Sequence, residues 1–172
     1  FPYVLTKDQI NCINDVLKDI SLIKPMNRVI CGDVGFGKTE IAMRGAFVAV
    51  HAKKQAMLLA PSTILAKQHL ESFVKRFFNF PVNIELLTRH TSQKNKLKIY
   101  EDFKHKKIDI LIGTHTLLNS EIALDNLGLL VIDEEHRFGT KQKEIIKSRQ
   151  STTHILYTVS YTHLTLPTTR LV

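Results

Sequence analysis

A chain of 172 residues is long enough for one compact domain and too short for two of average size. Lysine and arginine outnumber aspartate and glutamate by 24 to 16, and the resulting net charge of +8 favours a polyanionic partner. The two cysteines, Cys12 and Cys31, lie far apart and do not indicate a disulfide framework or a zinc site. Since no apolar run approaches the roughly 20 residues of a membrane span, we expect a soluble, cytoplasmic protein. The chain begins at Phe1 in sequence that already reads as folded, which suggests a piece of a longer protein.

Short apolar runs rich in Val, Ile and Leu alternate along the chain with longer segments of helical periodicity. In chain order, the pattern predicts a helix at 6–21, a strand at 28–31, a helix at 38–51, a strand at 55–60 and a helix at 63–78. It then predicts a strand at 83–88, a helix at 92–105, strands at 108–112 and 129–132, a helix at 140–149 and a further strand at 154–158. This alternation is typical of an α/β domain with a doubly wound, mostly parallel sheet.

The first strand leads into a glycine-rich loop, GDVGFGKTE at 32–40. A glycine, four residues and then Gly-Lys-Thr form the Walker A pattern, which requires a strand before it and a helix after it. Backbone N–H groups of such a loop point at phosphate oxygens. We expect Lys38 to reach the β and γ phosphates of ATP and Thr39 to bind Mg²⁺. The predicted nucleotide-binding loop comprises Gly32, Asp33, Val34, Gly35, Phe36, Gly37, Lys38 and Thr39.

A pair of carboxylates follows the apolar strand at 129–132, in the sequence DEEH. Asp133 comes at the carboxyl end of that strand, where α/β sheets place their ligands, and is predicted to hold Mg²⁺ directly or through water. Glu134 is the predicted general base or water-orienting group. His136 has two open interpretations: it couples the state of the phosphates to the rest of the protein, or it packs structurally.

The segment at 159–172, VSYTHLTLPTTRLV, differs in composition from the rest, since it has no Asp, Glu or Lys and is rich in Thr. We therefore expect one domain over 1–158, followed by an unstructured or artefactual tail over 159–172. Its abrupt onset resembles an out-of-frame or adapter-derived read. No residue of the tail is a predicted site residue.

Together, the Walker A loop and the DExH spelling of residues 133–136 resemble the superfamily 2 helicases and translocases. Within that group, CGDVGFGKTEIAMRGAF and DEEHRFG closely resemble the transcription-repair coupling factors. The branch-migration helicases of fork repair share GDVG.GKT and HRFG but match less well at Glu40. The resemblance covers Phe1 to Thr158 and implies a RecA-like P-loop NTPase domain, the first motor lobe of such a protein. The Thr-Ala-Thr-Pro motif that couples hydrolysis to DNA in this family is absent from the chain.

The resemblance also implies roles for residues outside the two ATP motifs. Gln9 is expected at the adenine edge, although Thr6 and Gln9 are also spaced as a helix capping box. APSTILAKQH at 60–69 and IGTHTLL at 112–118 resemble segments that contact the DNA backbone. The residues implicated there are Ser62, Thr63, Thr114 and His115. An ordinary helix cap and a structural histidine are the competing interpretations.

The implied function is that of an ATP-binding lobe of an ATP-dependent double-stranded-DNA translocase in transcription-coupled repair. RNA polymerase and nucleotide-excision-repair proteins are the expected partners of the full-length protein. Since a second lobe supplies the arginine finger in this superfamily, one lobe alone should bind Mg·ATP weakly and hydrolyse it slowly. The first lobe of a branch-migration helicase and a small-molecule P-loop kinase remain open. A third open alternative is a non-catalytic DNA-binding fragment in which the basic segment 89–107 binds DNA. The competing interpretation of that segment is a solvated helix face.

Overall fold

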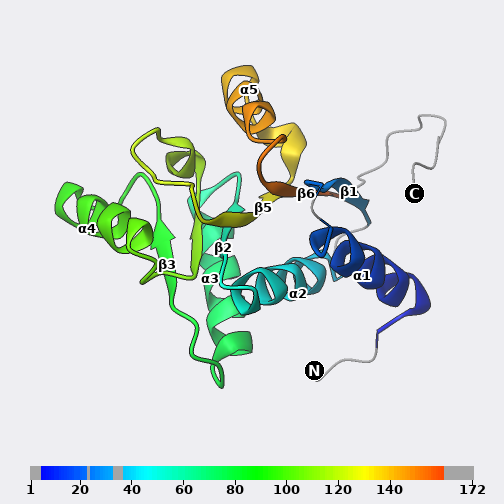
Figure 1. The fold of residues 1–172 in the computed structure, drawn as a ribbon. Helices are drawn as coiled ribbons and strands as arrows, with labels where there is room; N and C mark the ends of the chain where they lie inside the picture. Colours follow the sequence, from blue (N-terminus) through cyan, green and yellow to red (C-terminus); the bar gives the residue numbers. More distant parts are fainter. Residues whose placement is uncertain (1–4, 23, 33–36, 161–172) are drawn as a thin grey trace.

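The computed structural model describes residues 5–22, 24–32 and 37–160, in which helices and strands alternate (Figure 1). The helices are α1 (Lys7–Ile20), α2 (Lys38–His51), α3 (Thr63–Phe77), α4 (Gln93–Lys104) and α5 (Thr140–Ser148). The strands are β1 (Asn27–Cys31), β2 (Gln55–Leu59), β3 (Ile84–Leu87), β4 (Ile110–Gly113), β5 (Leu127–Asp133) and β6 (His154–Val159). Two short 3-10 helices, η1 (His115–Leu118) and η2 (Glu135–Arg137), complete the described elements.

The six strands form one sheet in the order β1-β6-β5-β2-β4-β3, and every neighbouring pair is parallel. The predicted α/β fold with a parallel sheet is therefore confirmed. Because the strands are parallel, their carboxyl ends lie along the same edge. The register pairs Asp133 with Thr158 and Cys31 with Val159, so the strand before the glycine-rich loop ends close to the strand that carries the acidic pair.

Helices cover both faces of the sheet, with α5 on the opposite side from α1 and α2 in Figure 1. Side chains that alternate along each strand pack into two separate clusters. Ala56 and Leu58 of β2 face the layer of α1, α2 and α3, whereas Met57 and Leu59 face the layer of α4, η1 and α5. This burial of strands on both faces explains why their sequences are continuous apolar runs.

Polar residues set the ends of the helices close to their predicted positions. The hydroxyl of Ser92 accepts a hydrogen bond from Asn95 N, so Ser92 is the cap of α4 and the helix begins one residue later than predicted. Gly113 ends β4 where a β-carbon would lie 2.0 Å from Leu87 O, which explains the glycine there. None of the described helices is both long and apolar enough to cross a membrane.

Strand β6 lies between β1 and β5 and ends at Val159, the first residue of the segment that composition set apart. Ser160 follows β6 at the carboxyl edge of the sheet, where its backbone N–H donates to the Glu134 carboxylate. The remainder of the expected tail, residues 161–172, lies outside the described residues, as do residues 1–4 of the expected domain.

Candidate nucleotide-binding site

A cavity of about 370 Å³ opens at the carboxyl edge of the sheet, between the start of α2, one face of α3 and the end of β5. Four segments that are remote in sequence contribute its polar side chains: the start of α2, one face of α3, the end of β5 and the residue after β6. The lining residues are Gly37, Lys38, Thr39, Leu65, Gln68, His69, Ser72, Asp133, Glu134 and Ser160. The two predicted ATP motifs therefore meet at one site.

The side chain of Lys38 lies over the start of the glycine-rich loop. Its ammonium donates hydrogen bonds to Gly32 O at 2.6 Å and to Ser160 Oγ at 2.9 Å. Gly37 precedes α2 with a φ of 81°, a left-handed conformation that favours glycine. This turn leads into the start of α2, and Gly37, Lys38 and Thr39 line the cavity. Of the predicted loop residues, Asp33, Val34, Gly35 and Phe36 lie outside the described residues.

Both carboxylate oxygens of Asp133 are held by hydrogen bonds. Thr158 Oγ1 donates to Oδ1 at 2.6 Å, and His69 Nε2 lies 2.8 Å from Oδ2. Burial acts to raise the pKa of Asp133, whereas the hydrogen bonds from His69 and Thr158 lower it. The charges of His69 and Lys38 act in the same direction, so this pKa lies below its ordinary value. Because an ionised carboxylate only accepts hydrogen bonds, His69 Nε2 carries the proton between them.

Glu134 adopts left-handed backbone at a φ of 54°, which is unusual for a residue with a side chain. Such strain costs on the order of 1–3 kcal/mol and is typical of active sites. The Glu134 carboxylate accepts hydrogen bonds from the backbone N–H of Ser160 at 3.1 Å and from its hydroxyl. His136 lies beside it, with Nδ1 3.5 Å from Glu134 Oε2, and its side chain is 55% exposed. The predicted base therefore faces the same cavity as Lys38 and Asp133.

Gln9 closes a capping box with Thr6 at the start of α1. Thr6 N donates to Gln9 Oε1 at 2.9 Å, and Gln9 N donates to Thr6 Oγ1 at 3.3 Å. The same side chain reaches the glycine-rich loop, because a β-carbon at Gly37 would lie 2.7 Å from Gln9 Nε2. The capping role is thus present, and Gln9 also adjoins the predicted phosphate loop.

The four predicted DNA-contact residues lie where helices begin after β2 and β4. Ser62 caps α3 by accepting a hydrogen bond from Leu65 N at 3.2 Å, and Thr63 begins that helix. Thr114 is buried, with its hydroxyl 3.4 Å from that of Thr116, whereas His115 is exposed at the start of η1. Of the second pair, only the His115 side chain is exposed to solvent.

Sequence reasoning missed three residues that contact the motif side chains: His69, Thr158 and Ser160. His69 lies within a helix, and nothing in its local sequence indicates that its ring contacts Asp133. Thr158 could have been found from the parallel register of β5 and β6, which places it opposite Asp133. Ser160 is separated from Glu134 by 26 positions and belongs to a segment of unusual composition.

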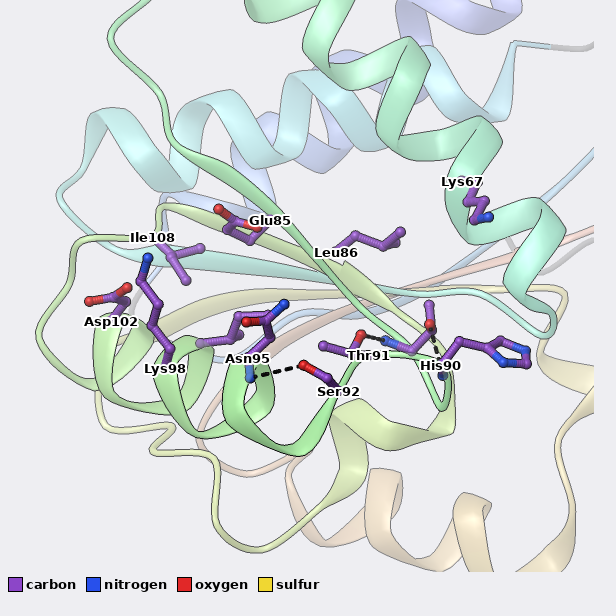
Figure 2. Close-up of a pocket in the computed structure, with 12 residues that line it drawn as sticks. Lys67, Glu85, Leu86, His90, Thr91, Ser92, Asn95, Lys98, Asp102 and Ile108 are labelled. Atoms are coloured by element: carbon purple, nitrogen blue, oxygen red, sulfur yellow. Dashed lines mark hydrogen bonds between the residues drawn. The ribbon is translucent and has the colours of Figure 1, made fainter.

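A larger cavity of about 630 Å³ lies between β3, α4 and the loop that joins them (Figure 2). Lys67 of α3 and Lys98 of α4 line it together with the carboxylates of Glu85 and Asp102. It contains no glycine-rich loop and no predicted nucleotide residue, and its charges are mixed in sign. The smaller cavity at the carboxyl edge is therefore the better candidate for a nucleotide.

The side chains at the smaller cavity fit a magnesium ion that is shared with a nucleotide. Thr39 and Asp133 present oxygen ligands, which Mg²⁺ prefers. Among the residues that the structure describes, no three His, Cys, Asp or Glu side chains cluster as a metal cage. Magnesium in phosphate-loop enzymes needs no such cage, because substrate phosphates and water complete its coordination.

The fold and the site define a P-loop NTPase of the helicase type. The sequence profile of the DEAD/DEAH box helicases matches residues 6–167, and the chain belongs to this family of ATP-dependent enzymes. The chain is also similar to a solved structure described as RecG bound to a three-way DNA junction. The TM-score is 0.81 at 33% identity, over 94% of this chain and 22% of that one. The RecA-like fold is thereby confirmed.

Within the family, the chain is similar to transcription-repair-coupling factors. It is 52% identical over 156 residues to the protein of Haemophilus influenzae and 51% identical over 156 residues to that of Escherichia coli K12. Each match covers 91% of this chain. The chain spans only 14% of the length of these two relatives, so it corresponds to their helicase-like region alone. The predicted resemblance to the coupling factors is confirmed.

Proposed function

We propose that this chain is the ATP-binding first motor lobe of a double-stranded-DNA translocase that acts in transcription-coupled DNA repair. The observation that carries the proposal is the meeting of Lys38, Asp133 and Glu134 at one cavity. The similarity to the coupling factors supports the repair role. RNA polymerase and nucleotide-excision-repair proteins are the partners we propose for the full-length protein.

Each site residue has a proposed part in binding or hydrolysis. Lys38 neutralises the β and γ phosphates of ATP, while Thr39 and Asp133 hold Mg²⁺, which offsets phosphate charge when bound. Glu134 orients the attacking water and accepts its proton, and its strained backbone fixes the direction of the carboxylate. His136 lies half-exposed beside Glu134. Its proposed role is to couple the state of the phosphates to the rest of the protein. Gln9 contacts the adenine edge while it caps α1.

Backbone contacts to DNA are proposed at the starts of α3 and η1. The N–H groups at the first turn of α3, which Ser62 caps, would donate hydrogen bonds to a phosphate, and Thr63 and His115 extend this surface. Thr114 makes the smallest contribution to this surface, because its side chain is buried and its backbone N–H already donates to Leu87 O at 3.3 Å. Such contacts bind DNA of any sequence, as a translocating motor requires. Their affinity falls as the salt concentration rises.

The isolated lobe should bind nucleotide yet hydrolyse it slowly. An arginine finger accelerates hydrolysis by about 10³ to 10⁵-fold, and in this superfamily it belongs to a second lobe. The test measures phosphate release from Mg·ATP, with and without duplex DNA, together with equilibrium nucleotide binding. The chain is compared with Glu134→Gln and with Glu135→Gln, a neighbouring carboxylate that pairs with Lys143 at 3.4 Å instead.

Nucleotide binding with turnover near background in every condition would support the half-site. DNA-stimulated turnover that Glu134→Gln abolishes and Glu135→Gln retains would show that one lobe has a complete active site, contrary to the proposal. Salt-dependent DNA binding without nucleotide binding would favour the non-catalytic DNA-binding fragment. Phosphate transfer to an organic acceptor would favour a small-molecule kinase.

A further inference from the structure

One hydrogen bond joins the middle of α3 to the carboxylate at the end of β5. His69 Nε2 lies 2.8 Å from Asp133 Oδ2, and the two side chains are only 12% and 15% exposed. Water therefore competes weakly for either group. Thr158 holds the other oxygen of the same carboxylate at 2.6 Å. With a partner on each oxygen, the plane of the Asp133 carboxylate is fixed, and one of its two supports comes from a helix outside both ATP motifs.

Helix α3 is itself firmly packed, which fixes the backbone position of His69. Ala66, Phe73 and Phe77 are each less than 5% exposed and pack in the core beneath the helix. His69 lies six residues after Thr63, about 9 Å along the axis at the usual rise. The first turn of α3 and the Asp133 carboxylate are thus attached to the same rigid element.

We propose that His69 is a positioning residue that holds the Asp133 carboxylate in the orientation that binds Mg²⁺. Because His69 belongs to α3, binding of the metal–nucleotide complex then depends on the position of that helix. This inference rests on the proposed function, because it assumes that Asp133 contacts the metal. Hydrogen bonds to carboxylate ligands typically contribute about 10 to 100-fold to metal affinity or activity.

The first measurement is the factor by which Mg²⁺ strengthens binding of a fluorescent ADP analogue to this chain. We compare affinity in excess Mg²⁺ with affinity in EDTA. His69→Ala should reduce that factor by about 10-fold or more while leaving the affinity in EDTA unchanged. His69→Gln should restore most of it, because the glutamine amide reaches about as far as Nε2. His69→Asn is shorter and should not.

The matched control is Glu71→Ala, an exposed residue two positions further along α3 that lines neither the cavity nor the Asp133 contact. It should leave the Mg²⁺ factor unchanged. The second measurement is hydrogen exchange of the α3 amides over 63–69. Mg·ADP should slow their exchange in the wild-type chain and in His69→Gln but not in His69→Ala.

The outcomes separate this inference from the proposed function. A wild-type chain that binds no nucleotide, or binds it without regard to Mg²⁺, overturns the proposed function and the inference with it. Nucleotide binding with an unchanged Mg²⁺ factor in His69→Ala overturns the inference alone. The inference also fails if His69→Ala weakens binding equally in EDTA, or if His69→Gln, folded as judged by circular dichroism, restores nothing.

Discussion

Two residues of the site hold left-handed backbone, and they differ in kind. Gly37 has a φ of 81° and needs no side chain, whereas Glu134 has a φ of 54° and keeps one. Glycine enters this region without steric cost, but a glutamate there stores strain. The strained residue is also the proposed base, which agrees with the tendency of such strain to lie where a side chain must be aimed.

Replacing Gly37 with alanine should destabilise the chain by about 1–2 kcal/mol, because alanine resists left-handed backbone. The new β-carbon would also lie 2.7 Å from Gln9 Nε2 and displace that side chain. The free energy of unfolding in urea, together with nucleotide affinity, measures both effects. Gly139→Ala is the control, since φ there is −73° and no atom lies within 4 Å of a β-carbon. An equal loss at Gly139 would contradict the explanation.

At this scale, the sequence predicted residues whose function depends on local spacing. Lys38 and Thr39 follow the glycines in a fixed pattern, and Asp133 and Glu134 follow an apolar strand. His69 could not be predicted, because its role arises from a contact across 64 positions. The strained backbone of Glu134 was equally hidden, since no rule of composition places a glutamate at positive φ.

Among the elements, α2 and α3 are joined by a cluster of charges around Glu40. Its carboxylate accepts from Arg44 Nε at 2.9 Å and from Arg76 Nη1 at 2.9 Å, and the three side chains are 15–20% exposed. Glu40 directly follows Thr39 of the proposed metal site, and Arg76 lies near the end of α3. The cluster therefore fastens the phosphate-loop helix to the helix that carries His69.

Glu40→Gln should destabilise the chain by about 1–3 kcal/mol, because it weakens charge-assisted hydrogen bonds in a partly buried place. Urea unfolding at two salt concentrations measures the effect, which should change little with salt. Glu101→Gln provides the comparison: its pair with His105 is 3.4 Å long and more than 60% exposed, so the change should be near zero. Similar losses for both variants would argue against the role of burial.

A second link between elements responds to pH. Met26 N donates to His154 Nδ1 at 3.0 Å, which requires that nitrogen to be unprotonated. Burial lowers the pKa of His154, and the Asp19 carboxylate acts in the opposite direction. The folded chain thus takes up this proton less readily than the unfolded chain, whose imidazole titrates near 6.5. Because the pKa of His154 is lower in the folded chain than in the unfolded chain, this residue stabilises the fold above about pH 6.5. That stability is lost as the pH falls from about 6.5 toward the folded-state pKa.

We expect the free energy of unfolding to decrease as the pH is lowered from about 7.5 to about 5.5. In His154→Asn the fall should be smaller, since the asparagine amide oxygen reaches about as far as Nδ1, can accept the bond and does not titrate. His105→Gln removes an imidazole that is 61% exposed and should keep the wild-type pH dependence. Identical pH profiles for all three chains would show that His154 does not contribute.

The strands and helices were predicted closely because each is a separate apolar run or amphipathic repeat, as at 55–60 and 63–78. Their spatial order could not be read in the same way. Strand β6 lies between β1 and β5, although 128 positions separate each residue of β1 from its partner in β6. Periodicity fixes which face of a strand is buried but not which strand lies beside it. The two short 3-10 helices also escaped prediction, since three or four residues show no period.

For the whole molecule, the sheet divides the core into two layers that should unfold together. Phe73 lies in the layer of α1, α2 and α3, and Phe103 lies in the layer of α4 and α5; both are at most 1% exposed. Phe73→Ala and Phe103→Ala should each destabilise by about 3–5 kcal/mol. Circular dichroism and tyrosine fluorescence should report one coincident urea transition in each. Separate transitions for the two variants would mean that the layers are independent units.

The position of β6 also bears on how the chain is made. Within the described sheet β1 pairs only with β6, and Gly32 N at the start of the glycine-rich loop bonds to Val159 O at 3.2 Å. During translation, β1 and the loop therefore cannot pair with β6 until most of the domain has been synthesised. The proposed nucleotide site, whose lining includes Thr158 and Ser160, is incomplete on the nascent chain until then. A chain that ends before β6 would therefore lack part of this lining and the strand that pairs with β1.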